Sequence, residues 1–138
     1  MKIREANSTD DLSDLLTQLG YPTTKEVAKS RLAKILTSDG AAFVAEEDGK
    51  LAGFIHVDAG FGIEHDAFAR IRALVVDERQ RNRKLGEQLV ARGEQWARER
   101  GLKIVVVISN VVRERARKFY ERNGYTVVKT SNVFEKRL

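Results

Sequence analysis

The chain of 138 residues has no cysteine and only two histidines. The lack of cysteine excludes disulfide bonds, thiolate zinc sites and a cysteine nucleophile, and two histidines are too few for a histidine-rich centre, so we predict no metal site. Long apolar runs are missing too: residues 104–108 fall far short of the ~20 residues that cross a bilayer. Acidic Asp10 and Asp11 stand where a signal peptide would need its apolar stretch, so we expect a cytoplasmic protein without a membrane partner.

The remaining composition is that of a globular domain. Hydrophobic residues make up 42% and charged residues 33%, which is too apolar for a disordered chain. The length fits one domain of roughly 100–200 residues, and no linker divides the chain, so we expect a single domain over residues 1–138. The net charge of +5 allows nucleic-acid binding. Interleaved glutamates, and the lack of zinc spacing and RNA-binding aromatic motifs, argue against it.

Hydrophobic periodicity predicts an α/β fold in the order β-α-α-β-β-β-α-β-α-β-β. Leucines 12, 15, 16 and 19 predict a first helix with Asn7 or Ser8 as N-cap and Gly20 as its end, and Thr23 or Thr24 begins a second. The other predicted elements are strands over 2–6 and 67–76, a hairpin of 41–46 and 51–57, a loop at Gly60 and Gly62, helices through 88–100 and 113–122, a fully covered central strand over 104–109, and final strands over 125–129 and 132–138. A central mixed sheet with helices on both faces accommodates this order.

A basic turn joins the strand over 67–76 to the following helix. Arg81, Arg83 and Lys84 precede an apolar helix face that starts at Leu85, and the small Gly86 lies in the first turn. A helix N-terminus presents unpaired N–H groups, which together with these cations suits a diphosphate. A solvated basic loop is the alternative. The strand–turn–helix placement favours the anion site.

Two motifs resemble the GNAT N-acetyltransferase superfamily. Residues 81–86, Arg-Asn-Arg-Lys-Leu-Gly, resemble its acetyl-CoA loop, Arg/Gln-x-x-Gly-x-Gly/Ala, and residues 116–125 resemble its A-x-x-(F/L)-Y-x-x-x-G-(F/Y). The predicted element order matches the family fold over essentially the whole chain. Lys84 departs from the pattern, because it stands where the first glycine is usual. The closer likeness is to small bacterial members such as aminoalkylphosphonate N-acetyltransferases, through Asn110, Arg113 and the tail around residues 131–136.

The resemblance implies an enzyme that moves an acetyl group from acetyl-CoA to a primary amine, of a small molecule, by direct attack in a ternary complex. A protein N-terminus or lysine is the alternative acceptor. A domain that binds CoA or nucleic acid without catalysis is the alternative of another class. The resemblance also allows a homodimer, since family members are often dimers.

The resemblance also assigns site residues. Tyr120 would be the general acid for the leaving thiolate, with a core aromatic as the alternative. The implied CoA contacts are the pantetheine-binding strand residues Leu74, Val75 and Val76, the pyrophosphate-binding residues Arg81, Asn82, Arg83, Lys84, Leu85, Gly86 and Glu87, and also Asn110 and Arg113.

The general base stays open. Residues 70–74 contain no carboxylate, so Glu64, His65 or Asp66 would serve directly or through water. Arg70 and Arg72, if they face the acceptor, would favour an anionic substrate. His56 we interpret as a packed strand residue.

Overall fold

The hairpin predicted over 41–46 and 51–57 forms the middle of the sheet. In the computed structural model, which describes residues 1–80 and 84–138, strands β2 (Ala41–Glu47) and β3 (Lys50–Gly62) pair antiparallel. Asp48 and Gly49 both have positive φ, 51° and 75°. Two successive residues with positive φ are typical of a type I′ turn, whose twist matches that of the flanking strands.

Five strands form one mixed sheet in the order β1-β2-β3-β4-β5. The added strands are β1 (Lys2–Glu5), β4 (His65–Val76) and β5 (Val105–Val107). Strands β1 to β4 pair antiparallel, and β5 pairs with β4 in parallel. The loop predicted at Gly60 and Gly62 is wrong, because both belong to β3. Gly60 lies opposite Phe68, whose ring occupies the space that a Cβ would need.

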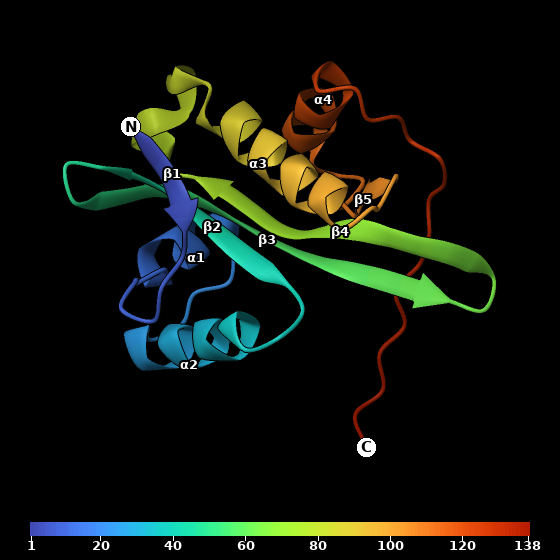
Figure 1. The fold of residues 1–138 in the computed structure, drawn as a ribbon, viewed down its shortest axis with the longest axis horizontal. Coiled ribbons are helices and arrows are strands. Elements are labelled where there is room, and N and C mark those ends of the chain that lie inside the picture. Colours follow the sequence, from blue (N-terminus) through green and yellow to red (C-terminus); the bar gives the residue numbers. More distant parts are fainter. The chain divides into compact units, whose positions relative to one another are not determined.

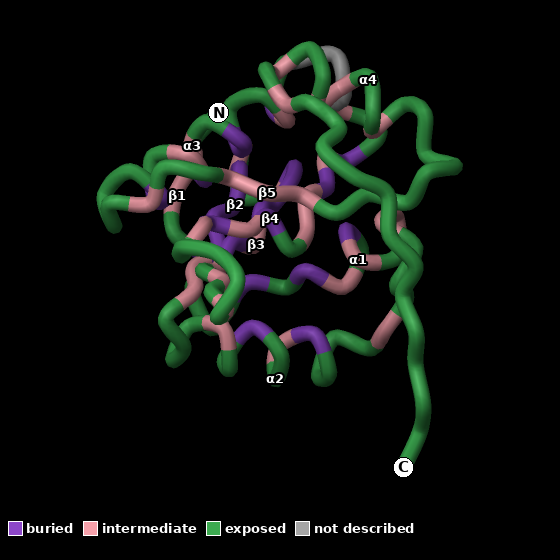
Figure 2. Tube along the Cα trace, turned by 90° about the vertical axis from the view of Figure 1, so that its right-hand side faces the viewer, coloured by how far each residue is buried: buried purple, intermediate pink, exposed green. Residues whose placement is uncertain are grey.

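Helices cover both faces of this sheet, as predicted. Figure 1 shows α1 (Ser13–Leu19) and α2 (Lys25–Leu36) on one face and α3 (Leu85–Glu99) on the other. Gly93 lets α3 approach Ile55 and Val57 closely. The core beneath α1 and α2 contains the buried residues Ala6, Leu12, Leu15, Leu32, Ala42, Val44, Phe54 and Val75. In Figure 2 the buried segments gather in the central strands.

The helix ends follow their predicted caps, with one exception. Thr24 accepts a hydrogen bond from the Val27 N–H at 3.1 Å, and Gly20 ends α1 with φ 102°. The N-cap predicted at Asn7 or Ser8 is wrong, because α1 begins at Ser13. The N-cap position is Leu12, whose side chain cannot accept a hydrogen bond, and the Asp11 carboxylate just before it accepts the Ser13 N–H at 3.0 Å.

The chain divides into two units, Met1–Val107 and Ile108–Leu138, and each is described by itself. The second unit contains α4 (Glu114–Arg122). The two strands predicted after it are wrong: residues 126–138 form no strand and are exposed, as the green tail in Figure 2 shows. Three successive charges at 135–137 interrupt the alternation that a half-buried strand needs.

The strand predicted to be covered on both faces is also corrected. β5 has three residues, all half-buried, and lies at the end of the strand order. Ile104 and Ile108, which flank it, are 58% and 78% exposed. An apolar run predicts burial only where a further strand pairs with it, and the described residues supply none. None of the described helices has the length and apolar content that a membrane crossing needs.

Candidate active site

The pairing of β4 with β5 ends halfway along β4. They pair over three positions, from Ala69 opposite Val105 to Ile71 opposite Val107. β4 then continues to Val76 while it pairs with β3 on its other side. From Arg72 onward, β4 therefore has an edge that no strand of the described residues covers.

A β-bulge in β4 follows directly after the end of this pairing. His56 of β3 lies opposite Ala73, and Val57 lies opposite Ile71, so Arg72 is an extra residue in β4. Bulges interrupt the ladder and redirect backbone groups, and they are frequent beside active sites. Along an antiparallel strand, alternate residues turn their N–H and C=O groups away from the partner. The open edge of β4 thus offers backbone donors and acceptors to an extended ligand.

The sequence-predicted residues Leu74, Val75 and Val76 all lie on this open edge. Each pairs with β3 on one side only. Val75 is buried beneath α1 and α2, while Leu74 and Val76 are half-buried. The fold therefore leaves the backbone groups of these three residues along one open edge of the sheet. Their contact with CoA stays a prediction.

Asp77 fixes the path of the chain as it leaves β4. Its N–H donates to the Ala52 carbonyl at 2.8 Å, and its carboxylate accepts the Arg79 N–H at 3.0 Å. The Arg79 guanidinium donates to both carboxylate oxygens, at 3.0 and 2.7 Å. The 3-10 helix η1 (Glu78–Arg83) begins at this cap.

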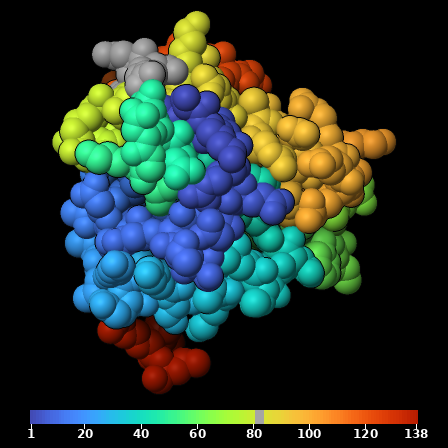
Figure 3. Space-filling view, turned by 60° about the vertical axis from the view of Figure 1, so that its left-hand side comes forward, coloured from blue at the N-terminus to red at the C-terminus, as the bar shows by residue number. Residues whose placement is uncertain are grey.

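A side chain of helix α1 also binds the start of this turn. The Glu78 N–H donates to Gln18 Oε1 at 3.0 Å. Figure 3 shows residues 78–80, in yellow-green, beside the blue N-terminal segment. Because β3 and α1 both bind the first residues of the turn, its direction is set by the packed part of the fold.

The hydrogen bonds to Arg79 also keep Asp77 ionised. They lower the pKa of this carboxyl to about 2, against the opposing effect of desolvation. The Asp77–Arg79 pair is therefore charged throughout the physiological pH range.

Lys84 ends the turn in the left-handed conformation, with φ 58° and ψ 25°. Glycine adopts this conformation at little cost, whereas a residue with a side chain is strained in it. Lys84 adopts this φ although it has a side chain. Its exposed side chain adds a cation at the start of α3.

Helix α3 begins directly after Lys84. The Gln88 N–H donates to the Lys84 carbonyl at 3.2 Å, so the N–H groups of Leu85, Gly86 and Glu87 precede this bond at the N-terminus of the helix. Leu85 is 1% exposed and anchors the turn in the core. These donors and the helix dipole fit a diphosphate.

Three residues of the predicted phosphate-binding set lie outside the described residues: Arg81, Asn82 and Arg83. Their contact with the pyrophosphate therefore stays a prediction.

The second unit holds the predicted general acid, Tyr120. Gly124 has φ 90°, and the turn that it forms lets the Tyr125 N–H donate to the Tyr120 carbonyl at 3.0 Å. The ring centroids of Tyr125 and Phe119 lie 5.7 and 5.2 Å from that of Tyr120. Burial raises the pKa of Tyr120 to about 12. The phenol thus stays protonated, as a donor must, but is a weaker acid than an unperturbed tyrosine.

Asn110 and Arg113 form the turn before α4. Asn110 Oδ1 accepts the Val112 N–H at 3.1 Å, and the Arg113 N–H donates to the Asn110 carbonyl at 2.9 Å. Their CoA contacts, like the acid role of Tyr120, stay predictions.

The candidates for general base lie far along β4 from its open edge. Glu64, His65 and Asp66 are exposed at the tip of the β3–β4 hairpin, where His65 Nε2 lies 3.1 Å from Glu64 Oε1. Asp66 precedes Ala73 by seven residues, or roughly 20 Å of strand. That distance is too long for direct proton transfer at the bulge.

The two arginines proposed to face the acceptor share one carboxylate. Arg70 donates to Asp58 at 3.0 and 3.2 Å, and Arg72 Nε lies 3.8 Å from Asp58 Oδ2. Asp58 therefore balances one of the two positive charges. In the described part of the chain, no three histidine, aspartate or glutamate side chains are grouped as a metal site would need.

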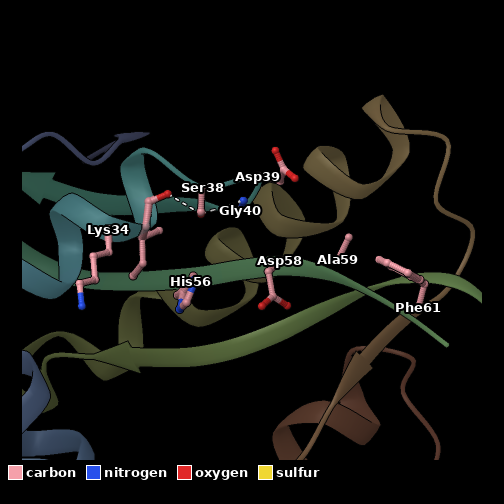
Figure 4. A pocket seen from close by; sticks show the side chains of 9 residues that line it. Lys34, Ser38, Asp39, Gly40, His56, Asp58, Ala59 and Phe61 are labelled. Carbon is pink, nitrogen blue, oxygen red and sulfur yellow. Dashed lines mark hydrogen bonds between the residues drawn. The ribbon is translucent and has the colours of Figure 1, made fainter.

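An open pocket of about 410 Å³ lies between the end of α2 and β3. Figure 4 shows its lining residues, which are Lys34, Ile35, Ser38, Asp39, Gly40, His56, Asp58, Ala59 and Phe61. The sequence analysis interpreted His56 as a packed strand residue and did not predict that it lines a pocket. Alternation places His56 on the same face as Phe54 and Asp58, but only the end of α2 shows that the face is open there.

Comparison with known proteins assigns this arrangement to a family. The model of the acetyltransferase (GNAT) family matches residues 9–125, which include the open edge of β4, the turn and α4. The chain belongs to the GNAT family. The resemblance stated from the two motifs is thereby confirmed.

Two relatives of this GNAT chain match part of its sequence. An aminoalkylphosphonate N-acetyltransferase of Salmonella typhimurium is 34% identical over 83 residues, 59% of this chain and 54% of the relative. An uncharacterised N-acetyltransferase of Methanocaldococcus jannaschii is 34% identical over 85 residues, 60% of this chain and 38% of the relative. The chain thus matches about half the length of the first relative and less of the second.

Solved structures share the fold. An aminoglycoside N-acetyltransferase, AAC(6′)-Iy, in complex with CoA has a TM-score of 0.88 at 21% identity, over 99% of this chain and 95% of the other. A GNAT family acetyltransferase of Staphylococcus aureus has a TM-score of 0.78 at 26% identity, over 99% and 98%. The predicted fold class is therefore confirmed.

Proposed function

We propose that this GNAT-family chain transfers the acetyl group of acetyl-CoA to a primary amine of a small molecule, by direct attack of the amine in a ternary complex. One observation carries the proposal. The open edge of β4 leads from the bulge at Arg72, through the turn capped by Asp77, to the N-terminus of α3. Donors for an extended arm are thus followed by donors for a diphosphate, the order in which CoA carries its pantetheine arm and pyrophosphate.

The relatives support the same chemistry. Two of them carry the name N-acetyltransferase, and AAC(6′)-Iy shares the fold in a complex with CoA. Acetyl-CoA supplies an activated acyl group as a thioester, and the protein has to align it with an amine. Alignment of two reactants is worth several kcal/mol of the barrier.

The residues of this chain would divide that work. Backbone groups of Leu74, Val75 and Val76 hold the arm, and the N-terminus of α3 with Lys84 holds the pyrophosphate. A main-chain N–H of β4 near the bulge at Arg72 donates to the carbonyl oxygen as negative charge develops there. Tyr120 donates a proton to the sulfur as the C–S bond breaks.

The pocket between α2 and β3 would take the acceptor. It lies on the face of the sheet to which His56 and Asp58 contribute, and Asp58 contacts the guanidinium of Arg72. Arg72 remains 47% exposed, so its charge is available to an anionic group. We therefore include an anionic amine, such as an aminoalkylphosphonate, among the proposed acceptors.

The experiment is CoA release from acetyl-CoA, followed with a thiol reagent across a panel of amines. The chain has no cysteine, so every thiol detected is CoA. The panel contains neutral amines, aminoalkylphosphonates, and peptides with a free N-terminus or lysine. We expect release with at least one small amine. Release with the peptides alone would favour the protein-acetylating alternative, and no release with any amine would contradict the proposal.

A further inference from the structure

One titratable side chain of the acceptor pocket has no role in the chemistry so far. His56 lies on β3 and contributes to the pocket wall beside the end of α2, and Figure 4 shows it extending from β3 next to Asp58. It is half-buried, and its ring forms no hydrogen bond with another residue in the described part of the chain. Its nitrogens are therefore available to a molecule in the pocket.

The strand register places His56 close to the open edge of β4. His56 lies directly opposite Ala73, the first residue after the bulge at Arg72. Adjacent strands are about 4.8 Å apart, so His56 is one strand away from the open edge of β4. Of the chain's two histidines, His65 lies at the hairpin tip, seven or more residues further along β4.

Burial and the neighbouring charges together favour the neutral form of the ring. Desolvation lowers the pKa of His56, the carboxylate of Asp58 opposes this, and the guanidiniums of Arg72 and Arg70 add to it. Lys34 and Asp39, at the end of α2 and the loop after it, line the same pocket with opposite charges. A neutral imidazole at pH 7 is able to accept a proton.

We propose that His56 is the proton acceptor for the amine, an inference that rests on the proposed function. The acceptor nitrogen gives one proton to a ring nitrogen of His56 and bonds to the carbonyl carbon. The C–S bond breaks, and its electron pair leaves with sulfur, which takes a proton from Tyr120 or water. His56 then gives its proton to solvent, and the phenolate of Tyr120, or the hydroxide left by water, takes one proton from solvent. The reaction therefore balances as amine plus acetyl-CoA giving amide plus CoA.

The test compares two matched variants, His56→Gln and His65→Gln. The wild type and both variants are assayed for kcat/KM between pH 5 and 9 with one accepted amine, and acetyl-CoA binding is measured by calorimetry. The amine's own titration is common to all three profiles. The ratio of wild type to His56→Gln therefore isolates the imidazole.

We expect His56→Gln to lower kcat by ~10²–10⁴-fold with an unchanged Kd for acetyl-CoA. The ratio of wild type to His56→Gln should decrease at acidic pH, where the imidazole takes up a proton despite its lowered pKa. His56→Ala should regain activity in added imidazole, which a purely structural role would not produce. An active wild type whose profile His56→Gln retains, or an effect from His65→Gln alone, would overturn the inference and leave the proposed function standing. A wild type inactive with every amine would instead refute the proposed function.

Discussion

Lys84 carries an unusual backbone conformation at the proposed phosphate site. It is one of two non-glycine residues with positive φ in the described structure, the other being Asp48 in the β2–β3 turn. A left-handed conformation costs a residue with a side chain roughly 1–2 kcal/mol. The lysine bears that cost where the family has glycine, and it adds a positive charge in return.

Lys84→Gly should separate the two effects. Relief of the backbone strain, partly offset by the greater freedom of glycine in the unfolded chain, should raise the free energy of unfolding by up to about 1 kcal/mol. Loss of the ammonium should weaken acetyl-CoA binding by roughly 3–10-fold, as for one helix-terminal charge. Urea unfolding and calorimetry measure the two quantities. Asp48→Gly is the matched control, and a Kd that changes equally in both variants would contradict the role of Lys84.

Tyr120 should act as a protonated phenol over the whole working range. Because burial raises its pKa to about 12, kcat should not fall between pH 8 and 10 through loss of the phenolic proton. Tyr120→Phe should lower kcat by ~10²–10⁴-fold and leave acetyl-CoA binding unchanged. Tyr125→Phe, one turn away, is the control. An unaltered kcat in Tyr120→Phe would remove this residue from the mechanism.

At the scale of elements, the sequence correctly predicted the helices, caps and turns that depend on residues close together in the chain. The leucine stripe of α1, the Thr24 cap of α2 and the turn at residues 48–49 all form as expected, because each depends on neighbours in sequence. The open edge of β4 is different. Its bulge at Arg72 and the end of pairing at Ile71 depend on strands that are distant in sequence. The motif at residues 81–86 therefore indicated a candidate site but could not predict the shape of the neighbouring strand edge.

The errors have the same physical origin. The apolar run over 104–108 predicts a covered strand only if another strand lies beyond it, and periodicity cannot supply that partner. His56 could be placed on a face of β3 by alternation. Its exposure to a pocket depends on where α2 ends, 20 residues earlier in the chain.

The turn after β4 yields a prediction on acid stability. The hydrogen bonds from Arg79 hold the pKa of Asp77 at about 2, below its unfolded value of 3.8. The pair therefore stabilises the fold above about pH 4, and this contribution is lost as the pH falls towards 2. Since Arg79 is exposed and its charge is screened, we expect about 1 kcal/mol at pH 7.

Asp77→Asn keeps the cap oxygen and removes the charge. The difference between wild type and variant in free energy of unfolding should be about 1 kcal/mol at pH 7 and close to zero near pH 2, as urea unfolding measures it. Taking this difference cancels the other carboxylates. An equal difference at both pH values would show that the charge of Asp77 does not stabilise the turn.

At the scale of the whole molecule, the family match spans residues of both units. The single domain over residues 1–138, the cytoplasmic location and the homodimer stay predictions. The net charge of +5 alone would suit nucleic acid as well as CoA. The two partners differ in their dependence on salt, since binding through phosphates of duplex DNA weakens steeply as salt rises.

The most direct test of the account is calorimetric titration of the full chain with acetyl-CoA, CoA and a duplex DNA at 50 and 200 mM salt. We predict one saturable site for acetyl-CoA and for CoA at both salt concentrations. At 100 times the Kd, acetyl-CoA should also add ~2.7 kcal/mol to the free energy of unfolding. DNA should give heat at low salt at most. No heat with either CoA or acetyl-CoA at millimolar concentration would contradict the proposed site between β4 and α3.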